Sequence, residues 1–194
     1  HCSNILNGMY SLGGMEDKAI VEYRVQFDPF FQHISYQGVP DIRVIVFRGI
    51  PVAAMIRLPT RESDGKANLH QGAIGLGIDL RTGVTTFGVH HNSAVSQHPD
   101  TGADTTRIQI PHWDTILRVA VDCADTVGLG YLGVDIVMDR QLGPLMLELN
   151  ARPGLNVQLA NRRGLLLNLE KWVSLKDIPA DRDARIALAC NGLD

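Results

Sequence analysis

The chain has 194 residues, enough for one domain with a sizeable core, and we expect residues 1–194 to form a single domain. Its residues are 45% hydrophobic and 20% charged, which is typical of a globular protein, and no apolar run is long enough to span a membrane. The net charge of −3 argues against non-specific binding to nucleic acid or to an anionic membrane surface, because both need clustered positive charge. Three cysteines without a CxxC pair, and no visible secretory signal, indicate reduced thiols in a cytoplasmic protein.

The first half of the chain predicts strands separated by turns and loops. Strands are expected at residues 19–25, 41–47, 52–58 and 72–80, with one more short strand after a turn at 79–83. The strands 41–47 and 52–58 are close enough along the chain to form a β-hairpin. The aromatic stretch 28–38 and the polar stretches 59–67 and 90–107 are expected to be loops, with 59–67 exposed to solvent.

The second half mixes helices with a further hairpin. Apolar residues recur at three- and four-residue spacing over 113–127, which predicts an amphipathic helix that ends at Gly128. Strands follow at 133–138 and 144–150, and helical segments are expected at roughly 157–174 and 181–190. Hairpins with interspersed helices predict an α+β fold, an antiparallel β-sheet with flanking helices.

The hairpin 133–150 carries acidic residues among apolar ones. Alternate residues of a strand share a face, so Met146, Glu148 and Asn150 are expected to point the same way. A turn that closes with Met138 opposite Leu145 also sets the pairs Val137–Met146, Asp135–Glu148 and Gly133–Asn150. Directly opposed side chains have Cβ atoms about 5 Å apart, so the two carboxylates would repel each other.

Two carboxylates at this spacing require that one be protonated or that a cation lie between them. Asp135, Glu148 and Asn150 offer only oxygen ligands, which suit Mg²⁺ or Mn²⁺. The turn that follows carries Arg152, and a metal with an adjacent guanidinium is what a polyphosphate needs. A half-exposed hairpin whose polar face meets solvent remains the alternative.

These residues resemble the ATP-grasp superfamily, whose metal-binding signature is an Asp on one strand and Glu-x-Asn on the next, commonly followed by a Pro-Gly turn. The nearest resemblance is to the glutamate-ligase branch, typified by the ligase that adds glutamates to a ribosomal protein. The matching segments, in chain order, are Val21-Glu22-Tyr23, Asp41-Ile42-Arg43, Ala67-Asn68-Leu69-His70-Gln71-Gly72, Gly133-Val134-Asp135 and Glu148-Leu149-Asn150-Ala151-Arg152-Pro153-Gly154. The lysine-bearing strand and the glycine-rich loop of that family have no counterpart here, so we expect the chain to be the C-terminal part of an ATP-grasp enzyme.

The resemblance implies an ATP- and Mg²⁺-dependent, ADP-forming carboxylate–amine ligase that acts through an acyl-phosphate. The carboxylic acid that it suggests is glutamate, and the amine would belong to a small molecule or a peptide. It leaves open whether this chain is active by itself. A nucleotide-binding module without catalysis and an ATP-grasp phosphotransferase are the other functions compatible with the sequence.

The resemblance also implies roles for single residues. Asp135, Glu148 and Asn150 would hold the metal, with Mn²⁺ as the alternative to Mg²⁺. Arg43 would face the γ-phosphate or the acyl-phosphate, and Asn68 and Arg152 would orient phosphate or the acyl substrate. The backbone around Val21, Glu22 and Tyr23, as a hinge strand, would bind the adenine edge.

Several other polar residues are expected to have no such role. Gln71 stands where the glutamate ligases carry Arg, which leaves the substrate specificity open. Arg57 is expected to face solvent, and His70 to be structural. The histidines 90, 91, 98 and 112 have a spacing that fits no familiar zinc site, so we expect them to be solvated.

Overall fold

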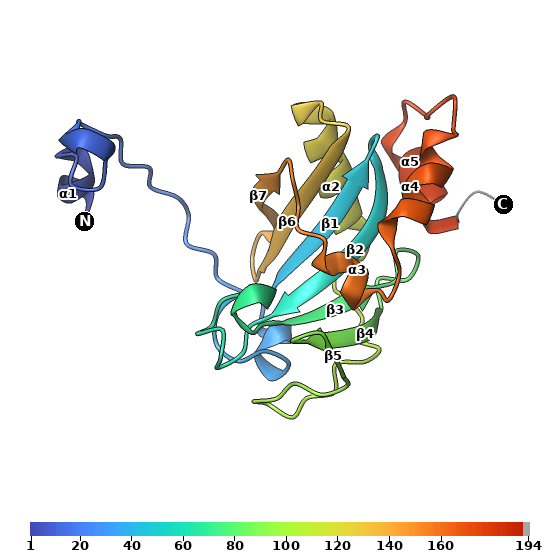
Figure 1. Cartoon of the computed structure of the whole chain (residues 1–194), viewed down its shortest axis with the longest axis horizontal. Coiled ribbons are helices and arrows are strands. Elements are labelled where there is room, and N and C mark those ends of the chain that lie inside the picture. The colour runs from blue at the N-terminus through green and yellow to red at the C-terminus, as the bar shows by residue number, and fades with distance from the viewer. Residues whose placement is uncertain (192–194) are drawn as a thin grey trace.

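A computed structural model describes residues 1–191 and contains one seven-stranded sheet in the order β5-β4-β3-β2-β1-β6-β7 (Figure 1). The strands are β1 Asp41–Phe47, β2 Ile50–Leu58, β3 Ile74–Ile78, β4 Thr85–His90, β5 Ser93–Val95, β6 Tyr131–Asp139 and β7 Gly143–Asn150. Every neighbouring pair is antiparallel. The predicted α+β fold, an antiparallel sheet with flanking helices, is confirmed.

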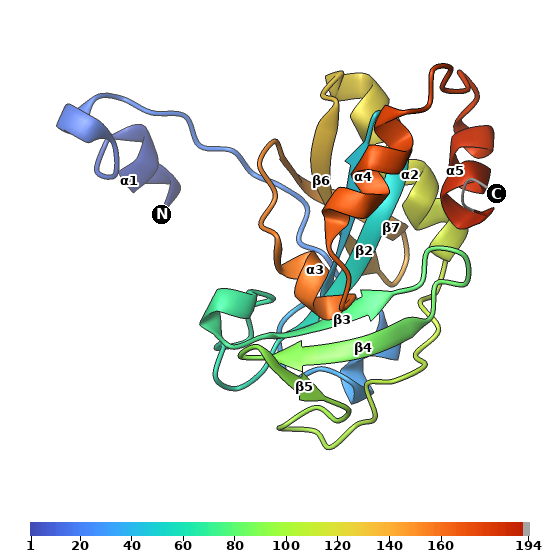
Figure 2. The ribbon, with the colours of Figure 1, turned by 45° about the vertical axis from the view of Figure 1, so that its right-hand side comes forward.

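Helices cover both faces of this sheet. Helix α2, Trp113–Val127, packs Ile116, Leu117 and Ala120 against one face, where side chains of β1, β2, β3 and β6 are almost fully buried. Helices α3, Asn156–Ala160, and α4, Leu165–Val173, cover the other face through Val157 and Trp172 (Figure 2). Burying each large apolar side chain contributes about 1.5–3 kcal/mol relative to leaving it exposed, so the two layers hold β1 and β2 firmly between them.

Two elements have the bounds that the sequence predicts. Strand β1 occupies residues 41–47, where isoleucine and valine favour a buried central strand. Helix α2 occupies residues 113–127 because its apolar residues fall on one face, and it ends where Gly128 adopts a left-handed conformation (φ 69°) that closes the last turn. Both signals are local, so they survive in the folded chain.

The predicted strand 19–25 is wrong. These residues are extended but pair with no strand among residues 1–191; the nearest pairing is a single bridge between Phe27 and Asp139. Ile20 and Val21 are 83% and 85% exposed. The apolar alternation was present, but a strand needs a neighbour for its backbone hydrogen bonds, and this segment has none.

The C-terminal helical region also differs from expectation. The segment 157–174 is two helices separated by a turn in which Arg162 has a positive φ of 49°. Asn161 fixes that turn, since its Nδ2 donates to Ala54 O of β2 at 2.9 Å. The last helix, α5 Arg182–Asn191, falls close to its prediction.

The stretch 90–107 contains β5, which pairs with β4, so it is not a loop throughout. Residues 59–67 lack strand structure, as expected, but are not uniformly exposed. Thr60 and Ser63 are 1% exposed and satisfy each other through reciprocal hydrogen bonds.

The N-terminal segment lies apart from the sheet. Helix α1, Cys2–Leu6, buries no residue, and an extended stretch joins it to the body of the fold (Figures 1 and 2). Nowhere in residues 1–191 is there a helix with the length and apolar character needed to cross a membrane.

Candidate functional site

The β6–β7 hairpin brings the predicted acidic residues together. Asp135 lies opposite Glu148 and Gly133 opposite Asn150, as expected. Nearer the turn the prediction is wrong by one residue, because Met138 lies opposite Pro144 and Val137 opposite Leu145.

A β-bulge between these two parts of the hairpin accounts for the difference. Leu147 is the extra residue, with no partner between Met146 and Glu148. Met146 therefore pairs with Ile136 and shares its face, so it does not lie beside Glu148 as alternation alone predicted. The bulge restores the register that sets Glu148 against Asp135.

Gly133 lets the chain after β7 fold back over this site. A Cβ on Gly133 would come within 2.6 Å of Cβ of Pro153, so only glycine leaves room for the turn beside Asn150. A Cβ on Gly154 would lie 3.9 Å from Nη1 of Arg43. The Pro-Gly turn thus lies next to the guanidinium of Arg43.

Asp135 is 1% exposed and its charge is compensated by two arginines. Arg43 donates from Nε to Oδ1 at 2.7 Å and from Nη2 to Oδ2 at 2.6 Å, and Arg57 donates to Oδ2 at 2.7 Å. Burial raises the pKa of Asp135, but the hydrogen bonds and charges of Arg43 and Arg57 outweigh it and leave the pKa below its usual value. Asp135 is therefore an ionised carboxylate held in a fixed orientation.

Arg57 is a site residue that the sequence prediction missed. It was expected to face solvent, yet its side chain is only 12% exposed and also forms a bidentate ion pair with Asp41. Burial raises the pKa of Asp41 to about 6, despite the hydrogen bonds and charge of Arg57. A usable signal was present: Asp41 and Arg43 alternate in an otherwise apolar strand, and Arg57 lies near the end of the strand that returns beside it.

Asn150 joins the two acidic residues of the hairpin. Its Nδ2 donates to Oδ2 of Asp135 at 3.4 Å and to Oε1 of Glu148 at 3.1 Å. The amide thus places a positive dipole between two carboxylates, and rotating it by 180° would direct Oδ1 to the same point. The three residues fit a hard cation such as Mg²⁺, since all three then present oxygen and Glu148 is exposed.

The structure does not bring Asn68 or Arg152 into this ion-pair group. Within residues 1–191, Arg152 is exposed in the turn after β7 and forms no ion pair or hydrogen bond. Asn68 caps the 3₁₀ helix η3, Leu69–Gln71, where its Oδ1 accepts from the backbone N–H of His70 at 3.0 Å.

The segment with Val21, Glu22 and Tyr23 is tethered to the end of β6. Tyr23 Oη donates to Oδ2 of Asp139 at 3.0 Å, and the backbone N–H of Gln26 donates to the same oxygen at 2.7 Å. Burial raises the pKa of Asp139, but backbone hydrogen bonds, with Tyr23, outweigh it and lower the pKa to about 2. These hydrogen bonds hold the end of this unpaired segment beside the sheet.

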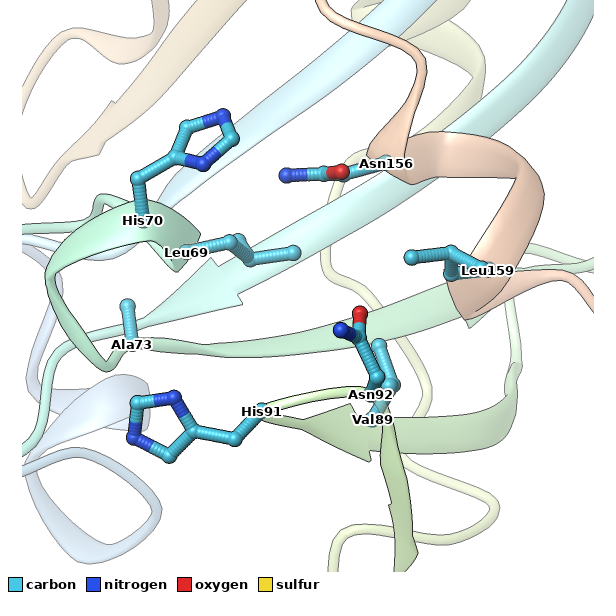
Figure 3. A pocket seen from close by; sticks show the side chains of 8 residues that line it. All are labelled: Leu69, His70, Ala73, Val89, His91, Asn92, Asn156 and Leu159. Atoms are coloured by element: carbon cyan, nitrogen blue, oxygen red, sulfur yellow. The ribbon is translucent and has the colours of Figure 1, made fainter.

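A cavity of about 330 Å³ lies beside η3 and α3, and no sequence pattern predicted it (Figure 3). Its lining residues are Leu69, His70, Ala73, Val89, His91, Asn92, Asn156 and Leu159. Aliphatic side chains form part of its wall, and imidazole and carboxamide groups supply its polar contacts. It carries no Lys, Arg, Asp or Glu in its lining.

Comparison with known proteins gives one family match and two curated relatives. Residues 1–173 match the family described as sugar-transfer associated ATP-grasp. A probable alpha-L-glutamate ligase of Maridesulfovibrio salexigens is 32% identical over 124 residues, which are 64% of this chain and 30% of that protein. A probable alpha-L-glutamate ligase of Sodalis glossinidius is 27% identical with the same coverage, so the chain spans about 30% of the length of each relative.

Two solved structures of the ATP-grasp ligase PsnB are more distant. The complex with minimal precursor, Mg and ADP shares 20% identity, covers 61% of this chain and 26% of that one, and has a TM-score of 0.30. The complex with minimal precursor shares 17% identity, covers 70% of this chain and 35% of that one, and has a TM-score of 0.35.

Proposed function

The chain belongs to the sugar-transfer-associated ATP-grasp family, and from this premise we propose that it forms the metal- and phosphate-binding part of an ATP-dependent, ADP-forming carboxylate–amine ligase. The observation that carries the proposal is the pair Asp135–Glu148 with the amide of Asn150 between the two carboxylates. Two opposed carboxylates beside buried arginines form a site for a divalent cation and a polyphosphate together.

In this proposal Asp135, Glu148 and Asn150 hold Mg²⁺ or Mn²⁺, which neutralises negative charge on the phosphate oxygens. Asp135 is oriented by Arg43 and Arg57 before any ligand arrives, so no reorganisation of this carboxylate is needed. Glu148 is exposed and free to reach a ligand.

Arg43 is the best-placed cation for a phosphate. Its Nε and Nη2 are engaged by Asp135, whereas Nη1 forms no hydrogen bond within residues 1–191 and faces the small residue Gly154. We assign to Nη1 the γ-phosphate or the acyl-phosphate. Arg152 and Asn68 are proposed to orient phosphate or the acyl substrate from the neighbouring loops.

The segment Val21–Tyr23 is proposed to bind the adenine edge through its backbone. Glu22 and Tyr23 form no backbone hydrogen bond among the described residues, so their N–H and C=O groups are open to a ligand. The hydrogen bond from Tyr23 to Asp139 then holds the segment in place.

The proposed reaction has two steps. An oxygen of the carboxylic acid forms a bond to the γ-phosphorus of ATP while the bond to the β–γ bridging oxygen breaks, which releases ADP. The amine nitrogen then bonds to the acyl carbon, phosphate leaves, and the nitrogen gives up a proton to solvent. Positioning and charge neutralisation dominate such phosphoryl transfer, so the site requires no side-chain nucleophile.

Glutamate is the carboxylic acid that the names of the curated relatives suggest, with an amine acceptor on a small molecule or a peptide. Gln71, in place of an arginine, removes one cation that a second carboxylate would need.

The test is thermal unfolding of this chain with Mg²⁺ and a non-hydrolysable ATP analogue. A ligand that binds only the folded state at 100 times its Kd stabilises it by about 2.7 kcal/mol, and we expect this rise in the parent but not in Glu148→Gln. Glu170→Gln, at an exposed glutamate of α4, is the matched control and should respond like the parent. Equal rises in the unfolding temperature of the parent and of Glu148→Gln would show that the metal does not bind at the hairpin.

A second assay tests the reaction itself. We expect ADP release that requires both a carboxylic acid and an amine. Phosphate transfer to a hydroxyl compound would show that the protein is a phosphotransferase and not a ligase. Nucleotide binding without any turnover would show that it is a nucleotide-binding module without catalysis.

A further inference from the structure

Three side chains that can coordinate a metal ion meet outside the β6–β7 hairpin. They are Glu62, His90 and His91. One ligand atom of each lies within 4.8 Å of the other two. Oε2 of Glu62 is 2.8 Å from Nε2 of His91 and 3.6 Å from Nε2 of His90, and the two imidazole rings are 4.3 Å apart. None of these residues belongs to the site proposed above.

The fold builds this cluster from a tight turn and a close backbone approach. His91 and Asn92 form the two-residue turn between β4 and β5, with φ of 46° and 64°, the type I′ geometry that suits the twist of a hairpin. That turn brings consecutive histidines together instead of on opposite faces of a strand. On the facing loop, a Cβ on Gly72 would lie 2.7 Å from the Glu62 carboxyl carbon, so the glycine makes room for Glu62.

We propose that Glu62, His90 and His91 bind a transition-metal ion of the Zn²⁺ class at the edge of the cavity. Two imidazoles with one carboxylate are a ligand set that zinc accepts, and imidazole selects zinc-like ions over Mg²⁺. Tetrahedral ligands at about 2.0–2.1 Å from zinc lie about 3.3 Å from one another, close to the observed 2.8 and 3.6 Å.

The exposure of the three side chains leaves room for a further ligand on a bound metal ion. The side chains of His91 and Glu62 are 51% and 56% exposed and that of His90 is 20% exposed, so a fourth position is open to water or to a ligand. By itself an exposed imidazole–carboxylate pair is weak, so the ion pair alone does not hold the three side chains firmly together.

Metal binding by His90 requires one hydrogen bond to be released. Nε2 of His90 lies 3.0 Å from the carbonyl oxygen of Gly72. That oxygen also accepts from Oγ1 of Thr60 at 2.7 Å, so it remains satisfied when the imidazole turns to a metal. The change leaves no buried acceptor without a partner.

A bound ion would join two loops that border the cavity. Glu62 belongs to the loop after β2, whereas His91 and Asn92 belong to the β4–β5 turn, and the latter two residues also line the cavity. Figure 3 shows the His91 ring directed away from Asn156 and Leu159, toward the outside of that wall. The metal would thus fix one wall of the cavity without filling it.

The test is Zn²⁺ binding to the full chain, measured by competition with a chromophoric chelator. We expect the parent to bind one zinc ion that His91→Ala and Glu62→Gln each weaken by about tenfold or more. His70→Ala removes a histidine that lines the same cavity but lies outside the cluster, and it should bind as the parent does. Because His91 and Glu62 are exposed, far-UV circular dichroism should report an unchanged fold in both variants.

Glu148→Gln separates this site from the hairpin. Zinc binding that survives Glu148→Gln but is lost in His91→Ala supports the cluster, whatever the outcome of the nucleotide experiment. The proposal is overturned if the parent binds no zinc, or if His91→Ala and Glu62→Gln bind it as tightly as the parent.

Discussion

Four charged residues, Asp41, Arg43, Arg57 and Asp135, lie side by side across β2, β1 and β6. Removing an ion from water costs several kcal/mol even after relaxation, so such charges persist only when they are paired and hydrogen-bonded. Here two carboxylates meet two guanidinium groups, and the group is neutral without a bound cation. A metal at Asp135 and Glu148 would therefore add to an arrangement that is already balanced.

Arg57→Ala is expected to destabilise the fold by about 3–5 kcal/mol, because it leaves the buried carboxylate of Asp41 without its partner. The double variant Asp41→Asn/Arg57→Ala should recover part of this loss, since the uncompensated charge is gone. Urea unfolding of Asp41→Asn, Arg57→Ala and the double variant measures the coupling free energy between the two side chains.

Arg61→Ala is the matched control for that cycle. Its side chain is 74% exposed and lies 3.9 Å from Asp100, so we expect a change within about 0.5 kcal/mol. Equal losses in Arg57→Ala and Arg61→Ala would contradict the structural importance of the buried network.

The end of β6 organises the segment that precedes β1. Asp139 accepts from the backbone N–H groups of Gln26, Gln141 and Leu142 and from the Tyr23 hydroxyl. One carboxylate therefore closes the β6–β7 turn and anchors the strand-like segment that the sheet does not pair. The segment 19–25 has the composition of a strand, but its position is set by hydrogen bonds to this turn.

Asp139→Asn is expected to weaken the acid sensitivity of the fold. The folded-state pKa of about 2 lies below the ordinary value of 3.8, so the carboxylate stabilises the fold above about pH 4, and that contribution is lost as the pH falls from about 4 toward 2. Urea unfolding at several pH values between 6 and 2 should show a shallower acid decline in Asp139→Asn than in the parent.

Tyr23→Phe is the control for this measurement. It removes one donor and leaves the three backbone donors in place, so most of the acid decline should persist. An identical pH dependence in the parent and Asp139→Asn would show that these hydrogen bonds do not depress the pKa of the carboxylate.

At the scale of the whole molecule, stability comes from a sheet covered on both faces. One cluster joins the sheet to α2, and a second joins it to α3 and α4, whereas α1 contributes no buried residue. Strand β7, at the edge of the sheet, is less covered than β6, with Met146 and Leu147 46% and 54% exposed. The proposed nucleotide site thus spans two well-covered strands, β1 and β6, and the less covered strand β7.

Deleting residues 1–17 is expected to leave the free energy of unfolding unchanged, because α1 buries nothing and lies apart from the sheet (Figure 1). Deleting residues 1–27 should cost about 1–3 kcal/mol, since Asp139 then loses the hydrogen bonds from Tyr23 and Gln26. Urea unfolding of the two truncated chains measures both values. An equal loss in the two would contradict the separation of α1 from the fold.

By itself the sequence determined the features that depend on neighbours along the chain. The periodicity of α2 and the apolar strand β1 follow from spacing over a few residues, and the structure confirms both. The predicted pairing of Asp135 with Glu148 is also confirmed, but it depends on the bulge in β7 and not on spacing alone. The bulge at Leu147 was invisible in the pattern because one extra residue can be inserted at any point of a short hairpin.

Only the tertiary structure decided which residues meet across the sheet. Arg57 reaches Asp135 because β1 lies between β2 and β6, an order that no local spacing contains. Glu62 meets His91 for the same kind of reason, through a loop and a turn 29 residues apart. Such contacts depend on strand order and on the path of loops, which the whole core fixes at once, whereas a sequence pattern reports only what its nearest neighbours require.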